Sequence, residues 1–201
     1  MSLPRYHNLT DVYDSIWKLL SRAANDKHHP AHFCTISTVD HGLPRARMVV
    51  LRKAVREANQ LYCYTDIRSD KMTELAAGSA LHWLLWDSKN RVQLRVLTTP
   101  EVERQTDYTR NIWANLPLAG KLSYLTEQAP GTPRAEYTDS LPHHIEQREA
   151  TDETPEELPD EHFCVLKGHI EEIEWLYLHP DGHQRARFKV GEELEHTWLI
   201  P

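Results

Sequence analysis

The spacing of apolar positions predicts one helix near the N-terminus and a series of strands after it. From Thr10 to Ala24 the apolar residues recur at the period of a helix, and Asn8 or Thr10 can cap its first turn. Short runs with strand-like patterning follow, separated by turn residues, at 31–39, 44–54, 60–65, 80–86 and 91–102. Because Asp40-His41-Gly42 provides a tight turn, we expect the first two strands to form a hairpin.

Two helical segments and a polar loop interrupt this strand pattern. A short helix is predicted at 69–77, where Ser69 can cap the first turn. A helical insert is predicted from about 103 to 126, with a first helix from Glu103 or Thr106 and a second over 118–126. Between 146 and 161 eight of sixteen residues are acidic, so we expect a flexible acidic loop over about 136–161. Strand patterning returns at 163–177, 185–190 and 196–199.

This order of elements predicts a mainly β protein with peripheral helices, built as an antiparallel barrel. A doubly wound α/β sheet would need a helix between successive strands, and the first half of the chain has almost none. The chain has 201 residues, which is enough for one large domain with a real core, so we expect a single domain over 1–201.

Composition and charge narrow the classes of function. The formal net charge is −7, which does not suit a protein that coats nucleic acid or an anionic membrane. No apolar run approaches the roughly 20 residues of a membrane-spanning helix. The three cysteines are far apart and odd in number, which favours a reducing compartment over a disulfide framework. We therefore predict a cytoplasmic protein that binds neither nucleic acid nor membrane.

The most informative stretch for chemistry lies between residues 45 and 71. Seven cations fall within these 27 residues of an otherwise acidic protein, and five of them are the candidates for the site, namely Arg45, Arg47, Arg52, Arg68 and Lys71. On a regular strand Arg45 and Arg47 share one face and Arg52 the other. The segment Tyr64–Lys71 then runs from a strand end into a helix N-terminus, where backbone N–H groups, hydroxyls and cations suit a phosphate dianion. A solvated strand edge with an ordinary helix cap would explain the same residues.

The thirteen histidines raise the question of a metal site. None of them falls into an HExxH motif or joins a paired CxxC, so the spacing does not indicate zinc. We therefore expect no metal. The chain also lacks GxGxxG and GxxxxGK[ST], so neither a dinucleotide-binding turn nor a P-loop is predicted.

Two motifs in this stretch resemble a known family. RMVVLR at 47–52 and YTDIRSDK at 64–71 resemble the FMN-binding pattern of the pyridoxamine 5'-phosphate oxidase family, which is R-x-V-L-L-K, then Y-T, then S-x-K. RVQLR at 91–95 is similar to the next motif, and the segments 173–175, 185–188 and 198–201 are similar to the final strands. The region 113–134 looks more like a flavoprotein subgroup of the family than like the authentic oxidase.

The resemblance implies a split β-barrel homodimer that holds FMN at the subunit interface. The residues that it implies as cofactor-binding are Arg47, Met48, Val49, Val50, Arg52, Tyr64, Thr65, Ser69, Lys71, Gln93 and Arg187. Arg47 and Lys71 would pair with the FMN phosphate. The hydroxyls of Thr65 and Ser69 would donate hydrogen bonds to it.

The other implied roles concern the flavin ring. Met48, Val49 and Val50 would supply backbone contacts beside the isoalloxazine. Gln93 would hydrogen-bond the ring. Arg187 would approach the ring from near the C-terminus, and one arrangement that the resemblance allows brings it across the dimer.

The chain departs from the family pattern at several positions. Arg52 replaces the family's Lys, and Asp70 replaces an Arg close to the implied phosphate. The family's final Arg-x-His-x-Arg reads Arg185-Ala186-Arg187, with no His in register. The Trp that covers the flavin in the family is either displaced to Trp175 or absent. These departures concern the substrate side more than the cofactor side.

Together the residues and the resemblance predict an FMN-dependent oxidoreductase that acts on a small-molecule substrate. Arg52, Tyr108 and Arg185 are the substrate-side candidates, because Arg suits an anionic substrate. No residue is assigned as a catalytic acid or base. Two alternatives stay open: a flavin-binding or flavin-storing protein without turnover, and a split-barrel protein that binds haem or a deazaflavin.

Overall fold

The computed structural model describes residues 4–142, 145 and 158–201 of the chain. Part of the predicted acidic loop, at 143–144 and 146–157, lies outside the described residues. The strands are β1 (Phe33–Asp40), β2 (Leu43–Val50), β3 (Lys53–Val55), β4 (Gln60–Asp66), β5 (Leu81–Asp87), β6 (Val92–Glu103), β7 (Phe163–Tyr177), β8 (Gln184–Val190) and β9 (Leu194–Leu199). The helices are α1 (Leu9–Asn25), α2 (Asp70–Ala76), α3 (Asp107–Asn115), α4 (Leu118–Lys121) and the 3₁₀ turn η1 (Leu122–Tyr124).

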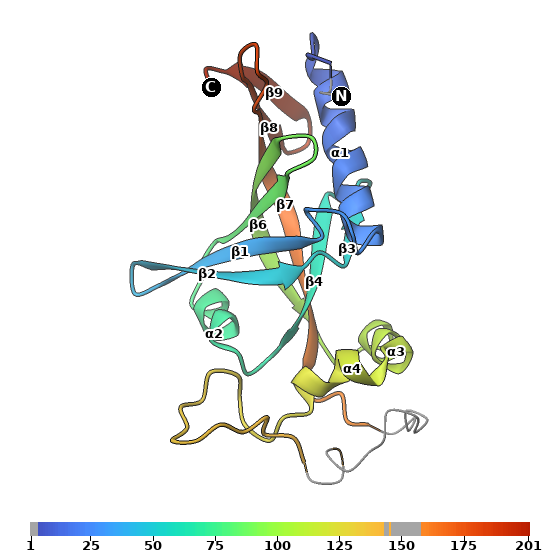
Figure 1. Cartoon of the computed structure of the whole chain (residues 1–201), viewed down its shortest axis with the longest axis vertical. Coiled ribbons are helices and arrows are strands. Elements are labelled where there is room, and N and C mark those ends of the chain that lie inside the picture. The colour runs from blue at the N-terminus through green and yellow to red at the C-terminus, as the bar shows by residue number, and fades with distance from the viewer. Residues whose placement is uncertain (1–3, 143–144, 146–157) are drawn as a thin grey trace.

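The described strands form one antiparallel sheet around the long strand β7. The order is β2-β1-β5-β6-β7-β4-β3, with β8 and β9 added beyond the upper part of β7 (Figure 1). The first half of β7 pairs with β4 and its second half with β8. The predicted hairpin of β1 and β2 is confirmed, and its turn residues His41 and Gly42 both have positive φ, at 46° and 80°.

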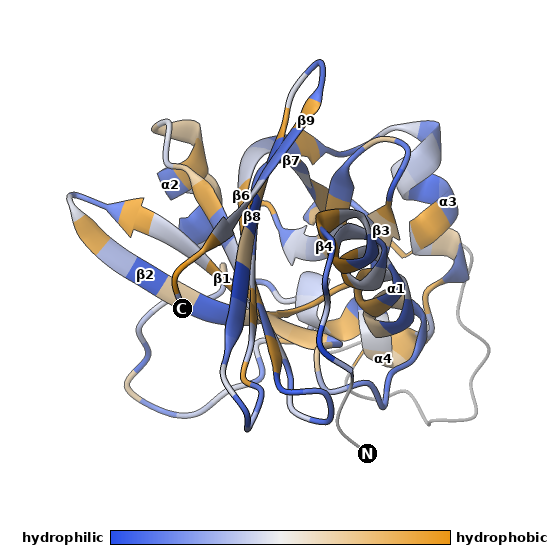
Figure 2. Ribbon diagram, turned by 90° about the horizontal axis from the view of Figure 1, so that it is seen from above, coloured by the Kyte–Doolittle hydropathy of each residue, from blue (hydrophilic) through white to orange (hydrophobic). Residues whose placement is uncertain are grey.

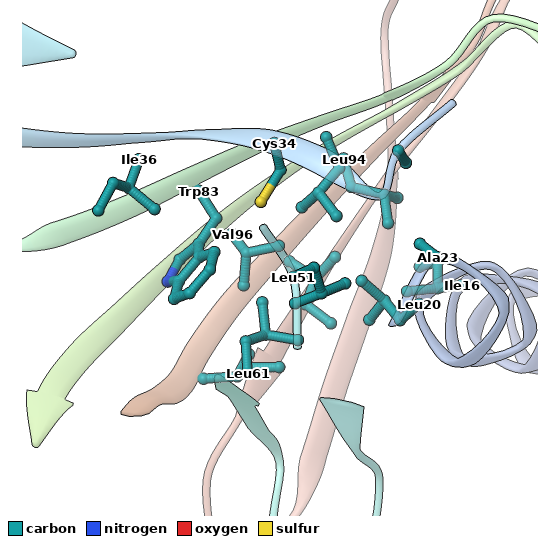
Figure 3. Packing of buried hydrophobic residues seen from close by; sticks show 14 of the residues in the cluster. Ile16, Leu20, Ala23, Cys34, Ile36, Leu51, Leu61, Trp83, Leu94 and Val96 are labelled. Atoms are coloured by element: carbon teal, nitrogen blue, oxygen red, sulfur yellow. The ribbon is translucent and has the colours of Figure 1, made fainter. Parts of the chain in front are cut away.

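The main core lies between α1 and the sheet. Asn8 caps α1 by accepting from the backbone N–H of Asp11 at 2.7 Å. Ile16 and Leu20 on its buried face are fully excluded from solvent and face Leu51 and other core residues from the strands (Figure 3). Figure 2 shows apolar and polar residues interleaved along the strands, as expected for a sheet with one buried face. Within the described residues no helix is long and apolar enough to cross a membrane.

A second apolar cluster fixes the helical insert beneath the barrel. Trp113 of α3 is 5% exposed and packs against Phe163 of β7, with ring centroids 5.4 Å apart. Its indole Nε1 donates to the carbonyl of Leu158 at 2.8 Å. The insert therefore covers the outside of β4 and the start of β7, and its position is set by packing rather than by helix length. The predicted helix over 118–126 is shorter than expected, since a 3₁₀ turn replaces its second half.

The predicted continuous strand at 44–54 is wrong. The chain leaves β2 after Val50 and re-enters the sheet as β3, which pairs with β4 instead of β1. Leu51 N–H donates to the His32 carbonyl and Arg52 N–H to the Tyr62 carbonyl, at 2.9 and 2.8 Å. Burial of Leu51 in the core drives this crossing between two parts of the sheet. The face of Arg52 therefore does not follow from simple alternation.

Two smaller expectations also need correction. Ser69 occupies the N-cap position of α2, but its hydroxyl donates to the Asp66 carbonyl at 2.7 Å instead of accepting from the helix. Trp175 is 1% exposed and packs edge-on against Tyr6, with ring centroids 5.5 Å apart. Because its ring is enclosed in the core, Trp175 does not take the place of the family's flavin-covering Trp.

Candidate functional site

Three of the predicted phosphate ligands meet where β4 ends and α2 begins. The ammonium of Lys71 donates to Thr65 Oγ1 at 2.6 Å and to Ser69 Oγ at 2.7 Å. Thr65 and Ser69 are 5% and 7% exposed, whereas Lys71 is half-buried. We call these three residues the cradle. The hydroxyl of Thr65 accepts from Lys71 and makes only a long contact of 3.5 Å with Ser69 Oγ, so its hydrogen can turn to a closer acceptor.

The ammonium of Lys71 has no counter-charge in direct contact. Among the described residues no carboxylate forms an ion pair with it, and both of its hydrogen bonds go to neutral hydroxyls. Burial lowers the pKa of Lys71, and repulsion from Arg47 lowers it further. A partly buried cation without a counter-ion favours binding of an anion. The cradle is therefore built for a negatively charged group.

Arg68 holds the loop beneath the cradle rather than a ligand. Its guanidinium grips the Asp66 carboxylate with two bonds, Nε to Oδ1 at 3.0 Å and Nη2 to Oδ2 at 2.7 Å. Its Nη1 donates to the Thr126 carbonyl at 2.8 Å. Such a bidentate pair is among the stronger polar contacts in proteins. It ties the turn between β4 and α2 to the helical insert.

Arg47 lies close to the cradle but is held by two polar partners. Its Nη2 donates to Glu74 Oε2 at 2.8 Å, and its Nη1 donates to the Thr38 hydroxyl. Thr38 also donates to Glu74, so the three side chains form a closed triad. Glu74 and Thr38 are 8% and 2% exposed. The sequence interpretation missed Glu74, although its place three residues after Lys71 on the same helix could have indicated it.

A cleft of about 610 Å³ opens beside Arg47. Arg45, Asp70 and Glu74 also line it. Arg45 pairs with Asp40 at 3.2 Å, so part of the cleft's positive charge is neutralised. Asp70 adds a carboxylate to the same cleft. The cleft is therefore of mixed charge, in contrast to the cradle.

The three predicted ring-contact residues follow Arg47 along β2. This strand is at the edge of the sheet and pairs only with β1 among the described residues, so its other edge keeps free backbone groups. Met48 is 61% exposed, Val49 packs on the core, and Val50 lies opposite Phe33. The backbone of this segment is accessible, as contacts to a ligand require.

Met48 and Arg187 lie on the same face of the sheet but far apart. We call the side turned away from the core the outer face. One row of cross-strand partners on it is Met48, Thr35, Leu84, Arg95, Glu174 and Arg187. From β2 to β8 this row crosses five strand spacings, about 24 Å at roughly 4.8 Å each. One copy of the chain therefore does not bring Arg187 to the β2 segment.

Gln93 and Arg185 belong to a neighbouring row of the outer face. Gln93 lies opposite Leu176, and Leu176 opposite Arg185. Arg185 donates through Nη2 to Glu174 Oε1 at 2.8 Å, while its buried Nε has no acceptor among the described residues. Arg95 contacts the same Glu174 oxygen at 3.1 Å. The carboxylate thus neutralises two arginines near Gln93.

Four large apolar side chains are exposed on the outer face. We call Phe33, Met48, Leu84 and Trp86 the apolar patch; their exposed fractions are 58%, 61%, 41% and 41%. They belong to the adjacent strands β1, β2 and β5. A contiguous group of large exposed apolar side chains often marks a surface that binds another molecule.

Arg52 and Tyr108, two of the substrate-side candidates, lie near Tyr64. The guanidinium of Arg52 stacks over the Tyr64 ring at 5.1 Å. Burial raises the pKa of Tyr108, and its neighbours Tyr62 and Tyr64 raise it further. These residues sit where β3 and β4 approach α3. Arg185, the third candidate, lies on β8 and is not part of this group.

The donor set of the site fits a phosphate dianion. Lys71, Arg47 and Thr65 offer one ammonium, one guanidinium and one hydroxyl, and each can make a charge-assisted hydrogen bond to a phosphate. Within the described residues no group of three or more His, Cys, Asp or Glu side chains could hold a metal ion.

Sequence comparison places this site within a known domain family. Residues 14–102 match the family described as pyridoxamine 5'-phosphate oxidase, FMN-binding domain. This part of the chain is therefore similar to that family. The matched region contains Arg47, the cradle and Gln93, so the resemblance of the two motifs is confirmed at the level of the family. A comparison with curated proteins found no significant match.

Solved structures share the fold over the full chain. A pyridoxamine 5'-phosphate oxidase-related, FMN-binding protein of Nostoc punctiforme has 20% identity and a TM-score of 0.74, with 100% of both chains covered. PhzG of Burkholderia lata, in complex with tetrahydrophenazine-1-carboxylic acid, has 15% identity and a TM-score of 0.76 over 100% of both chains. A Clostridium acetobutylicum protein related to general stress protein 26 has 11% identity and a TM-score of 0.56, covering 92% of this chain and 97% of its own. The predicted split-barrel fold is therefore confirmed.

Proposed function

We propose that the chain binds FMN through the cradle and Arg47 and works as an FMN-dependent oxidoreductase. The observation that carries this proposal is the half-buried ammonium of Lys71, which contacts two hydroxyls and no carboxylate among the described residues. A phosphate dianion supplies the missing counter-charge. The match of residues 14–102 to an FMN-binding domain supports FMN over other phosphate-bearing ligands.

Each residue has a distinct task in this proposal. Lys71 and Arg47 neutralise the phosphate, and Thr65 donates its hydroxyl hydrogen to it in place of its long contact with Ser69. Ser69 helps to fix the Lys71 ammonium while its own hydrogen stays with the Asp66 carbonyl. When bound, FMN supplies the redox chemistry of its ring, and the protein binds and orients it. No residue of the site is assigned a proton-transfer step.

Thr38 and Glu74 act on Arg47 rather than on the ligand. Both are buried and both contact the guanidinium, so they hold the long side chain of Arg47 in one position. A fixed guanidinium loses less conformational entropy when phosphate binds. The negative charge of Glu74 also weakens the attraction of Arg47 for phosphate. Lys71 is therefore the stronger of the two cations in this proposal.

The proposal includes a homodimer with FMN at the subunit interface. The apolar patch offers a surface for a second copy of the chain. Arg187 is five strand spacings from Met48 within one copy, so an arginine from the partner is needed if Arg187 serves the ring. Arg52 and Tyr108 are placed to meet an anionic small-molecule substrate. All three cysteines are buried and unpaired, which supports a reducing compartment such as the cytoplasm.

The binding step is tested by the absorbance and FMN affinity of the purified protein. We expect flavin bands near about 375 and 450 nm after reconstitution with FMN. Lys71→Met should raise the dissociation constant for FMN about 10- to 100-fold, because one charge-assisted contact is lost. The matched control is Lys27→Met, an exposed lysine outside the site, which should bind like the wild type. Equal FMN affinity in Lys71→Met and the control would show that the phosphate site is wrong.

A flavin-storage protein without turnover is the second candidate. It is favoured by Glu174, which already neutralises Arg95 and Arg185 on the outer face beside Gln93. The FMN-loaded protein is mixed with NADH or NADPH and then with oxygen, and the flavin absorbance is followed. Repeated bleaching and recovery supports the oxidoreductase. A flavin spectrum that stays unchanged with nicotinamide and vitamer donors supports storage. A Soret band in the purified protein would show that the bound cofactor is haem and not FMN.

A further inference from the structure

A second cavity, partly open to solvent, lies away from the cradle, between α1 and the β5–β6 hairpin. It measures about 170 Å³ and shares no lining residue with the cradle or with the cleft beside Arg47. An engineered apolar cavity of roughly 150 Å³ is large enough to hold benzene. The space is therefore large enough for a single six-membered ring with a small substituent.

One wall of this cavity carries a buried histidine with a free donor. The side chain of His29 is 5% exposed, and its Nδ1 accepts from the backbone N–H of Ala31 at 3.2 Å. Burial lowers the pKa of His29, so the neutral ring predominates and its hydrogen sits on Nε2. The nearest carboxylate oxygen, Asp87 Oδ2, is 3.7 Å away, which is too long for a hydrogen bond. The Nε2–H group thus has no acceptor among the described residues.

Asp87 does not need this donor. Its carboxylate is 1% exposed and accepts from Asn90 Nδ2 at 2.6 Å and from the backbone N–H groups of Lys89 and Asn90 at 3.0 and 3.2 Å. These bonds shape the β5–β6 turn and satisfy both oxygens. His29 is therefore not fully explained by a structural ion pair with Asp87.

Two cations of α1 border the same cavity. Lys18 and Arg22 lie one helical turn apart and both line it. Neither side chain has a hydrogen bond or ion pair among the described residues. Arg22 is close enough to His29 to contribute to the lowering of its pKa. With His29 neutral, two positive charges face the single, internally satisfied carboxylate of Asp87, so the cavity favours a monoanion over a cation.

The remaining wall is apolar and held in place. Trp175 and Val92 of the sheet are 1% and 3% exposed and form its floor. Tyr6 covers Trp175 edge-on, and its backbone is clamped to Gln184 by two hydrogen bonds of 3.0 and 2.8 Å. The N-terminal segment thus closes the cavity next to an indole ring. Such a wall suits a flat aromatic body.

We propose that this cavity is a binding site for a small aromatic monocarboxylate. The ring lies against Trp175 and Val92, and the carboxylate accepts from His29 Nε2–H and pairs with Arg22. Lys18, which is exposed like Arg22, adds a second positive charge at the rim. The site is independent of FMN binding, because none of its residues belongs to the cradle, β2 or the outer-face rows.

The experiment is a titration of the FMN-loaded protein with benzoate, followed by NMR of the His29 imidazole. We expect shifts of the His29 resonances that saturate with a dissociation constant on the order of 1 mM or tighter. Arg22→Met should weaken binding roughly tenfold, since one charge-assisted contact is lost. Arg56→Met is the matched control and should bind like the wild type, because Arg56 does not line the cavity and pairs with Asp14 in a neighbouring cleft, which Lys18 and Arg22 also border.

Several outcomes would overturn the proposal. The His29 resonances could remain unmoved by benzoate, which would mean that water alone satisfies Nε2–H. Arg22→Met and Arg56→Met could bind benzoate equally, which would place the ligand elsewhere, for instance beside the flavin. Benzylamine could bind as tightly as benzoate, which would contradict the sign of the charge. The flavin absorbance of the same samples reports FMN occupancy separately, so failure of this site is distinguishable from failure of the FMN proposal.

Discussion

The cradle and the outer face of the sheet differ in how far apart in the sequence their residues lie. In the cradle, Thr65, Ser69 and Lys71 come from seven consecutive residues that pass from a strand into a helix, and their contacts are direct. On the outer face, Gln93 and Arg187 come from different strands of the sheet, and Arg187 is about 24 Å from Met48 along it.

This difference separates a local site from one that the partner subunit would complete in the proposed homodimer. The cradle requires only that one short segment folds, so it is complete in a single copy of the chain. The outer-face residues can serve the same ligand only if a second copy covers the apolar patch. Phosphate binding and ring binding should therefore respond differently to loss of the dimer.

The largest expected effect comes from a charge in the apolar patch. Phe33→Glu should weaken the dimer at least about 100-fold, because a symmetric interface would bury the carboxylate twice at a cost of about 3 kcal/mol or more. Sedimentation measures the oligomeric state. Tyr137→Glu is the matched control, since Tyr137 is an aromatic residue that is 95% exposed outside the patch. If the wild-type protein is monomeric at all concentrations, the proposed homodimer is wrong.

The next prediction concerns Arg187 and tests whether it contacts the FMN of its own chain or that of the partner subunit. Arg187→Met should weaken FMN binding about tenfold by loss of one charged contact. Lys71→Met and Arg187→Met chains are then mixed and allowed to exchange. If Arg187 acts across the dimer, each mixed dimer regains one intact site, so about a quarter of all sites should bind FMN tightly. No recovery on mixing would mean that Arg187 serves its own chain or no site.

A smaller effect is expected within the cradle region, at Glu74. Glu74→Gln removes the charge that holds Arg47 but keeps a side chain of the same size. Loss of the carboxylate makes the site more positive, which strengthens phosphate binding, but it also frees the Arg47 side chain to move, which weakens binding. Because these two effects oppose each other, we expect the FMN dissociation constant to change by about threefold or less. The free energy of unfolding of Glu74→Gln relative to the wild type tests the pairing directly. Glu74→Ala serves as the comparison, and a tenfold loss of affinity in Glu74→Gln would mean that Glu74 is essential to place Arg47.

The last prediction concerns the charge of Lys71 and its effect on FMN affinity. This effect is the smallest at neutral pH and grows at alkaline pH. Burial lowers its pKa below the ordinary 10.5, so its ammonium loses a proton earlier than a free lysine does. FMN affinity should therefore fall as pH rises through the lowered pKa. In the same window the unfolded chain binds more protons than the FMN-free folded chain, so the free energy of unfolding of the FMN-free protein rises with pH. Lys71→Arg should keep FMN affinity flat, and a parallel fall in both proteins would exclude Lys71 as the cause.

Much of the fold followed from local patterns. The period of apolar residues located α1 to within a residue at each end, and Asp40-His41-Gly42 placed the β1–β2 turn. The junction of β4 and α2 was also predicted, because a strand, a capping serine and a lysine within one helical turn restrict the geometry closely. In these cases the residues that interact are neighbours in the chain.

Other features depended on contacts between distant segments. The break after Val50 arises because Leu51 is buried between α1 and the strands, and no local signal marks it. The enclosure of Trp175 depends on Tyr6, which is far away in the sequence. The partners of Arg47 likewise come from β1 and α2, so its engagement by Thr38 and Glu74 was not foreseen.

The amino-acid sequence by itself determined most of the elements, the mainly β class and the meeting of Thr65, Ser69 and Lys71 in the cradle, because each depends on periodicity or on side chains a few residues apart. Only the tertiary structure decided that Arg68 grips Asp66, that Arg47 is shared with a buried carboxylate, and that Arg187 lies five strands from Met48. The physical reason is that strands which pair in a sheet can be far apart in the sequence, so the sequence separation of two residues does not predict the distance between them in space.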